Sequence, residues 1–238
     1  MINYFKSITL CVLIFFSYPS VLAAQSTKKT HEIALLKLKA VFGDTLLTLN
    51  SGHYTLQNGD SVQISTCRFY ISHIQLFNYS ERVWTDPQRV HLIDIEQPET
   101  GELPMNIPAN MPFTDIEFQL GIDSLTHMSG VFGGDLDPMK GMYWAWQSGY
   151  INFKLEGKSP ICPTRRNAFQ FHIGGYAAPN NALQIVKLDV NRRKPLIIHV
   201  DIQKFLSHLD LKKQHTFMIP SLEAVDLAQL MASCFYTL

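Results

Sequence analysis

Nine histidines are the residues of this chain best suited to chemistry, because neutral imidazole binds copper and zinc alike. Their spacing matches no local metal motif, so a metal site would have to be assembled by the fold. His172 is the strongest single candidate, since it lies in the run NAFQFHIGGY and is followed at once by Gly174 and Gly175. Glycines let a backbone turn tightly or let a ligand approach closely. The pattern supports a ligand and a purely structural histidine equally at His172, whereas at each of the other histidines a surface or structural role is the simpler interpretation.

Two of the three tryptophans, Trp144 and Trp146, stand two residues apart in the aromatic run GMYWAWQSGY. In an extended segment, alternation places both side chains on the same face. Three interpretations follow: the rings fill a core, they form an exposed platform that stacks on a sugar, or one indole is oxidised. Just before them, Asp135 and Asp137 could bind a hard cation such as calcium, although an Asx-type turn with Pro138 is the simpler interpretation.

Several function classes are disfavoured by what the sequence lacks. Twenty basic and twenty acidic residues cancel, and no basic block appears, which disfavours nucleic-acid binding. There is no G-x-S-x-G elbow, P-loop, G-x-G-x-x-G fingerprint or H-E-x-x-H motif. We therefore expect a binding protein and not an enzyme.

The first residues have the order of a secretory signal, with Lys6 ahead of an apolar run and Val21-Leu22-Ala23 at its end. We expect a signal peptide over residues 1–23, a flexible polar leader over 24–31, and one domain over 32–238. No later stretch is long and apolar enough to span a membrane. The expected location is the periplasm or the extracellular space.

Cleavage removes Cys11 and leaves Cys67, Cys162 and Cys234. In an oxidising compartment the simplest count is one disulfide and one thiol. The sequence does not fix the pair. Cys162 in a loop and Cys234 near a terminus are the candidate partners, while Cys67 lies in an expected strand and is interpreted as a buried thiol.

The elements that must position these residues are mostly strands, because short apolar runs are separated by turn residues such as Asn58-Gly59 and Gly133-Gly134. Ser221 is an expected N-cap for one amphipathic C-terminal helix, and residues 202–209 predict a shorter one. The fold class is all-β: a single-domain β-sandwich or barrel-like antiparallel sheet with a short C-terminal helix. The strands are expected at 33–42, 61–77, 90–95, 115–120, 151–155, 168–173, 183–188 and 196–200.

Five sequence blocks resemble those of a known family. The blocks CRFYISHIQL, VHLIDIE, FQLGIDSLTHMSG, LDPMKGMYWAWQSGYINFKLEG and AFQFHIGG are similar to the MbnP-like family, exported partners of di-haem peroxidase-like proteins encoded in methanobactin operons. The four-Cys metallo-mystery pair proteins carry related blocks, but this chain has three cysteines after cleavage. The resemblance runs from about Ile33 to the C-terminal helix.

The resemblance implies copper, bound by histidines and by a kynurenine that forms when a tryptophan is oxidised, with the di-haem cytochrome c peroxidase-like protein as the oxidant. Transferred to this sequence, it makes His172 the best-placed ligand, with His91 and His127 as further metal ligands within family blocks, and Trp144 or Trp146 as the oxidised residue. The expected function is exported copper binding. The alternative is a metal-free extracytoplasmic module that binds a glycan or a protein through its aromatic surface.

Overall fold

The computed structural model of the protein describes residues 31–146, 149–190 and 195–238. The expected signal peptide and nearly all of the expected leader lie outside these residues, and the first strand begins at His31. Among the described residues, no helix has the length and apolar character needed to cross a membrane.

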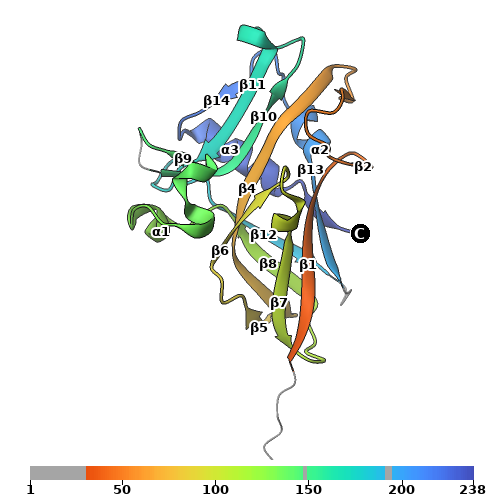
Figure 1. Ribbon diagram of the computed structural model, residues 1–238, viewed down its shortest axis with the longest axis vertical. Coiled ribbons are helices and arrows are strands. Elements are labelled where there is room, and N and C mark those ends of the chain that lie inside the picture. Colours follow the sequence, from red (N-terminus) through yellow and green to blue (C-terminus); the bar gives the residue numbers. More distant parts are fainter. Residues whose placement is uncertain (1–30, 147–148, 191–194) are drawn as a thin grey trace, which may run out of the picture.

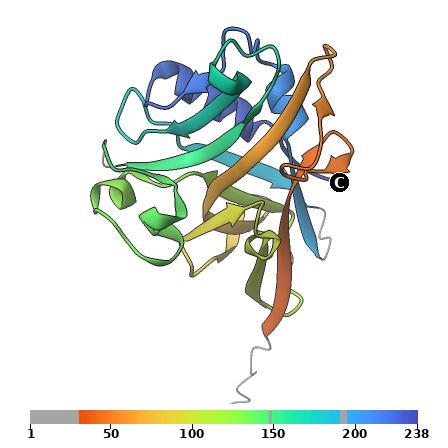
Figure 2. The ribbon, with the colours of Figure 1, turned by 45° about the horizontal axis from the view of Figure 1, so that its top comes forward.

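Two curled β-sheets make up most of the structure (Figures 1 and 2). The five-stranded sheet has the order β15-β13-β1-β2, with β7 also pairing β1. The ten-stranded sheet has the order β12-β8-β4-β10-β11-β14, with β3, β5 and β6 also pairing β4 and with β9 pairing β10. The strands are β1 (His31–Phe42), β2 (Thr45–Leu46), β3 (Tyr54–Thr55), β4 (Ser61–Asn78), β5 (Glu81–Thr85), β6 (Val90–Asp94), β7 (Glu102–Pro108), β8 (Asp115–Leu120), β9 (Tyr143–Trp144), β10 (Gly149–Lys158), β11 (Ala168–Gly174), β12 (Gln184–Asp189), β13 (Leu196–Asp201), β14 (Thr216–Phe217) and β15 (Phe235–Thr237).

The expected all-β fold is confirmed, and the eight expected strands correspond to β1, β4, β6, β8, β10, β11, β12 and β13. Most strand pairs are antiparallel, but β1 pairs β13 and β11 pairs β14 in parallel. Strand β7 has no counterpart among the expected strands because it contains Pro104 and Pro108. It pairs only with β1 in the described sheet, and prolines are tolerated at such an edge.

The helices among the described residues are few and short, and the longest of them is the C-terminal one. Ser221 caps it as expected, because its hydroxyl accepts a hydrogen bond from the Ala224 N–H at 3.1 Å. Leu227 and Met231 bury its inner face. The helices are α1 (Ser124–Met128), α2 (Ile202–Ser207) and α3 (Leu222–Ala232), with 3-10 turns η1 (Pro98–Gly101), η2 (Gly134–Leu136), η3 (Pro138–Lys140) and η4 (Arg165–Asn167).

The main core draws on both sheets and on α2. In β1, alternation buries Leu36 and Leu38, while Lys37 and Lys39, which alternate with them, are only partly buried. From the ten-stranded sheet, Phe153 and Phe171 enter the same core, and both rings contact Phe205 of α2 with centroids 5.9 and 5.6 Å away. Such aromatic contacts fix the position of β10 and β11, the two strands that carry the site described next.

Candidate functional site

One face of the ten-stranded sheet points away from the main core, and Trp144 and His172 both lie on it. In β4, Phe69 belongs to the main core, whereas Tyr70 belongs to a separate apolar cluster on the opposite face. In β11, Phe171 belongs to the main core, and alternation turns His172 to the opposite side. We call this the outer face. Residues 121–146 cover it with α1, two 3-10 turns and β9 (Figure 1).

Trp144 packs directly on the backbone of β11. A β-carbon on Gly174 would lie 2.9 Å from Cζ3 of the indole and 2.7 Å from the Tyr150 carbonyl oxygen, so only glycine lets the ring lie here. Trp144 is 4% exposed, and its Nε1 is buried with no hydrogen-bond partner among the described residues. The glycine turn singled out in the sequence therefore receives the indole of Trp144.

Trp146 contacts Trp144 but lies at the surface. Their ring centroids are 6.0 Å apart at an angle of 48°, and Trp146 is 63% exposed. Only Tyr143 and Trp144 form β9, so the extended segment that would place both rings on one face ends after Trp144. The pair therefore combines one buried indole with one that a partner can reach.

His172 lies two residues before Gly174 on the same face of β11, so it neighbours the site of Trp144. Its side chain is 8% exposed, and its Nε2 lies 2.6 Å from Oε1 of Glu156 on β10. An ionised carboxylate can only accept, so Nε2 carries the hydrogen and Nδ1 holds the lone pair when the ring is neutral. Mainly because of this hydrogen bond, the pKa of Glu156 falls to about 2.

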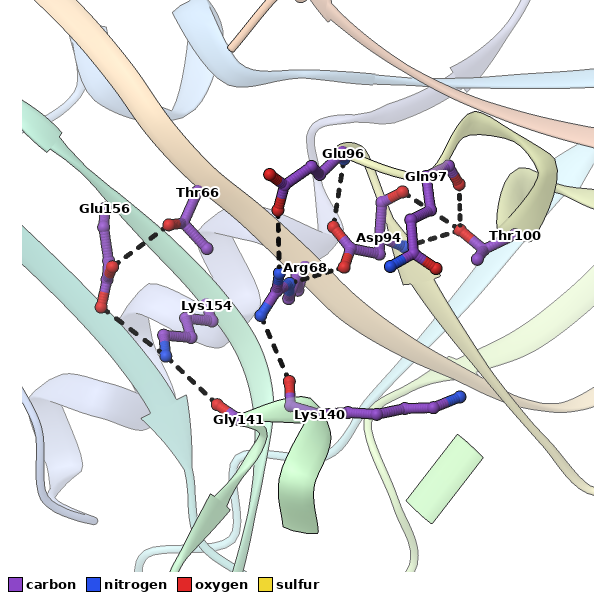
Figure 3. A network of polar contacts seen from close by, with 10 residues as sticks. All are labelled: Thr66, Arg68, Asp94, Glu96, Gln97, Thr100, Lys140, Gly141, Lys154 and Glu156. Carbon is purple, nitrogen blue, oxygen red and sulfur yellow. Dashed lines mark hydrogen bonds and ion pairs between the residues drawn. The ribbon is translucent and has the colours of Figure 1, made fainter. Parts of the chain in front are cut away.

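A row of charged side chains continues from this pair across the sheet (Figure 3). The register aligns His172 with Lys154, Lys154 with Arg68, and Arg68 with Asp94. Nζ of Lys154 lies 3.7 Å from Glu156 Oε1, and Nε of Arg68 lies 2.7 Å from Asp94 Oδ2. The row thus extends over four strands, with two neighbouring cations, Lys154 and Arg68, each paired with a carboxylate.

The same two cations hold the turn that leads to the tryptophans. Nη1 of Arg68 donates to the Lys140 carbonyl at 3.2 Å, and Nζ of Lys154 donates to the Gly141 carbonyl at 3.1 Å. Gly141 has a φ of 72°, a conformation that favours glycine. These contacts connect the histidine row to the backbone just before β9, so both parts of the site have a fixed relative position.

His127 is buried among aromatic rings. Its Nδ1 accepts a hydrogen bond from the Tyr150 N–H at 3.1 Å, and its ring stacks on Tyr176 with centroids 4.9 Å apart. Burial lowers its pKa to about 4, although the side chain of Asn152 and the carboxylate of Asp123 oppose this. A neutral ring whose Nδ1 accepts must carry its hydrogen on Nε2. His127 therefore has no free lone pair to offer a metal in this arrangement.

His91 lies on the other side of the sheet from His172. It pairs with Ile71 of β4, a main-core residue, three register positions from the Arg68–Asp94 pair and so on the opposite face. Its Nε2 lies 2.5 Å from Asp86 Oδ2. The three sequence-predicted ligands are thus not brought together. Within the described ranges, no group of three or more His, Cys, Asp or Glu side chains could hold a metal ion.

The partner that sequence reasoning missed is Glu156. The alternation in INFKLEG does place Lys154 and Glu156 on one face, which was a usable signal. The pairing of β10 with β11 was not readable, and that register is what brings Glu156 beside His172. The two earlier aspartates have structural roles: Asp137 accepts from the Met139 N–H at 2.9 Å in the expected Asx-type turn, and Asp135 binds Lys140 at 2.9 Å.

The three cysteines of the described chain are free and buried. The Cys162–Cys234 disulfide expected from the sequence is therefore not formed in this structure. Cys162 is held in the turn after β10, whereas Cys234 follows α3 and its Sγ donates to the Leu230 carbonyl at 3.3 Å. Cys67 is the buried strand thiol that we expected, and its pKa is raised by burial.

The fold and the site define an all-β domain with a histidine–carboxylate pair beside two tryptophans. A family model described as MbnP matches residues 32–221, so this chain belongs to the MbnP family. A solved structure titled MbnP from Methylosinus trichosporium has a TM-score of 0.51 and 13% identity, covering 77% of this chain and 80% of that chain. At this identity the likeness establishes the fold alone. No curated protein matches the chain.

Proposed function

We propose that this chain is an exported copper-binding protein, not an enzyme, whose site is centred on His172 and contains Trp144 or Trp146 in oxidised form. The observation that carries the proposal is the position of the His172–Glu156 pair, because His172 lies two residues along β11 from Gly174, on which Trp144 rests. The chain's membership of the MbnP family and its signal-like N-terminal sequence support copper handling outside the cytoplasm.

The His172–Glu156 pair fits one copper ligand. Metal-bound histidines usually donate their second ring N–H to a carboxylate, which fixes the tautomer and directs the other nitrogen to the metal. Here Nε2 takes the carboxylate, so Nδ1 would bind. The other encoded donors do not fit, because His127 is used internally and His91 lies on the opposite side of the sheet. The described side chains alone do not make a complete copper site.

An oxidised tryptophan supplies the kind of donors that the encoded side chains lack. In the proposed reaction, the bond between C2 and C3 of the indole breaks and each carbon gains one oxygen, while two molecules of hydrogen peroxide are reduced to water. Hydrolysis then releases the C2 carbon as formate and leaves kynurenine, with an aryl amine and a ketone. We propose a di-haem peroxidase-like protein as the partner that uses the peroxide.

The test uses the mature chain purified from its host with and without the di-haem partner. Intact mass and peptide mapping report oxidation at Trp144 or Trp146, and elemental analysis reports copper. We expect copper to remain only with chains that carry kynurenine, and His172→Ala to abolish its retention. The exposed His53 gives the matched control, His53→Ala, which should retain copper. Equal copper retention by the unmodified chain or by His172→Ala contradicts the proposal.

A second function has one observation in its favour, the exposure of Trp146. A metal-free module could stack this indole on a sugar ring or on a protein side chain. In that case Trp146→Ala abolishes ligand binding on a glycan array, whereas chelators leave it unchanged. Loss of binding on chelation excludes this alternative.

A further inference from the structure

The cover of the outer face exposes many apolar side chains. Thirteen large hydrophobic residues are exposed in the described chain, and six of them fall between positions 125 and 146. Exposed apolar groups gathered in this way are typical of interaction sites, and methionines and aromatics are enriched in interfaces. We call these six the apolar projection: Leu125, Met128, Val131, Phe132, Met139 and Trp146.

The backbone of the projection is held by polar contacts with the sheet, so these side chains are not needed to anchor it. The hydroxyl of Tyr150 accepts from the Phe132 N–H at 3.2 Å, and the hydroxyl of Tyr70 donates to the Asp135 carbonyl at 3.1 Å. The anchored backbone therefore presents its apolar groups to solvent. Figures 1 and 2 show α1 and the turns before β9 at the rim of the ten-stranded sheet.

Helix α1 has one side that packs on the sheet and another side that is exposed to solvent. His127 is buried against Tyr150, whereas Leu125 and Met128 are 68% and 66% exposed. Residues three apart on a helix are neighbours on one side, so these two form a continuous outward apolar strip. Asp123 caps this helix by accepting from the Thr126 N–H at 2.9 Å. A capped turn with an apolar outward side has the form of a docking element.

The charge around the projection is acidic. Residues 121–146, which carry the projection, contain three carboxylates (Asp123, Asp135 and Asp137) and one lysine, Lys140. The two cations that contact the base of this segment, Arg68 and Lys154, are paired with Asp94 and Glu156. Within the projection segment, Lys140 is bound to Asp135, which leaves the charges of Asp123 and Asp137 unbalanced. Complementarity therefore calls for a cationic partner surface, and it disfavours anionic membranes and nucleic acids.

We infer that the apolar projection is the docking surface for a protein partner whose contact face has an apolar centre and a rim of lysine and arginine. The inference rests on the proposed function, in which that partner is the di-haem protein. A partner that covers the projection touches Trp146, whose ring contacts the buried Trp144. The same contact thus gives the partner access to the tryptophan pair.

Binding of the di-haem peroxidase-like protein of the same host to the immobilised mature chain tests the surface. The variant Leu125→Gln with Met128→Gln keeps helix propensity but removes the apolar strip. We expect it to weaken binding at least about tenfold. The matched control, Ile33→Thr with Ile185→Thr, removes two equally exposed apolar residues from strands outside the projection and should leave affinity unchanged.

A second variant tests the charge. Asp137→Asn retains an acceptor for the Met139 N–H while it removes one negative charge. We expect a slower association at low salt, with dissociation unchanged. Circular dichroism verifies that each variant is folded.

If the di-haem protein binds the wild type and the double variant with equal affinity, the projection is not the docking surface, but the proposed function is unaffected. Failure of the wild type to bind the di-haem protein overturns the partner in the proposed function, and this assignment with it. If the wild type self-associates and the double variant does not, the projection binds a second copy of the chain. That result also overturns the inference.

Discussion

His127 should make the protein less stable in mild acid. Burial lowers the pKa of its imidazole from 6.5 to about 4, so the folded chain binds this proton more weakly than the unfolded chain. The stabilising effect of keeping the ring neutral is complete above pH 6.5 and is lost as the pH falls to about 4. At 1.36 kcal/mol for each pKa unit, the loss amounts to roughly 3 kcal/mol.

The variant His127→Asn isolates this effect. Its side-chain oxygen can replace Nδ1 as the acceptor for the Tyr150 N–H, but it does not titrate in this range. Urea unfolding, followed by tryptophan fluorescence at several pH values, should show the wild type losing about 3 kcal/mol more than the variant between pH 7 and 4. His53→Asn, on the surface, should follow the wild type. Parallel curves for the wild type and His127→Asn would refute the reasoning.

Three further outcomes are expected. Glu156→Gln replaces a charged acceptor of its histidine by a neutral amide, so urea unfolding at pH 7 should show a loss of about 1–2 kcal/mol. Gly174→Ala should cost about 1–3 kcal/mol and alter the near-UV circular dichroism of Trp144, because the new methyl group overlaps the indole; an unchanged spectrum contradicts this packing. Burial raises the pKa of the Cys67 thiol and raises that of the Cys234 thiol to about 11. A thiol reagent at pH 7 should therefore label both cysteines only after the protein is unfolded. If Cys234 is not labelled in protein that is unfolded but not reduced, it forms a disulfide.

Much of the fold was predictable because its strands carry strong local signals. The residues 115–120 alternate between apolar and polar side chains, and β8 spans that range. The Ser221 cap of α3 is equally local. Strand β7 was missed because its two prolines are unfavourable in most strands, and only its position beside a single neighbour makes them acceptable.

The site was only partly predictable because it depends on register between distant strands. His172 and Trp144 were singled out by glycines and aromatics close in sequence. Glu156 joins them through the pairing of β10 with β11, whereas His91 lies an odd number of residues from Asp94 on β6 and therefore faces the other side of the sheet. A shift of one residue moves a side chain to the other face of a sheet, and no local pattern in this sequence determines that parity.

The hydrogen bonds from Arg68 and Lys154 to the backbone before the tryptophans affect how this protein can change during evolution. Both side chains bind carbonyl oxygens, at Lys140 and Gly141, and every residue type has a carbonyl oxygen. These anchors therefore do not depend on side-chain identity, although the turn at Gly141 still favours glycine. The neighbouring exposed Met139 can be replaced without loss of these anchors. The sheet can thus keep one arrangement of its charged row while the side chains of the cover above it change.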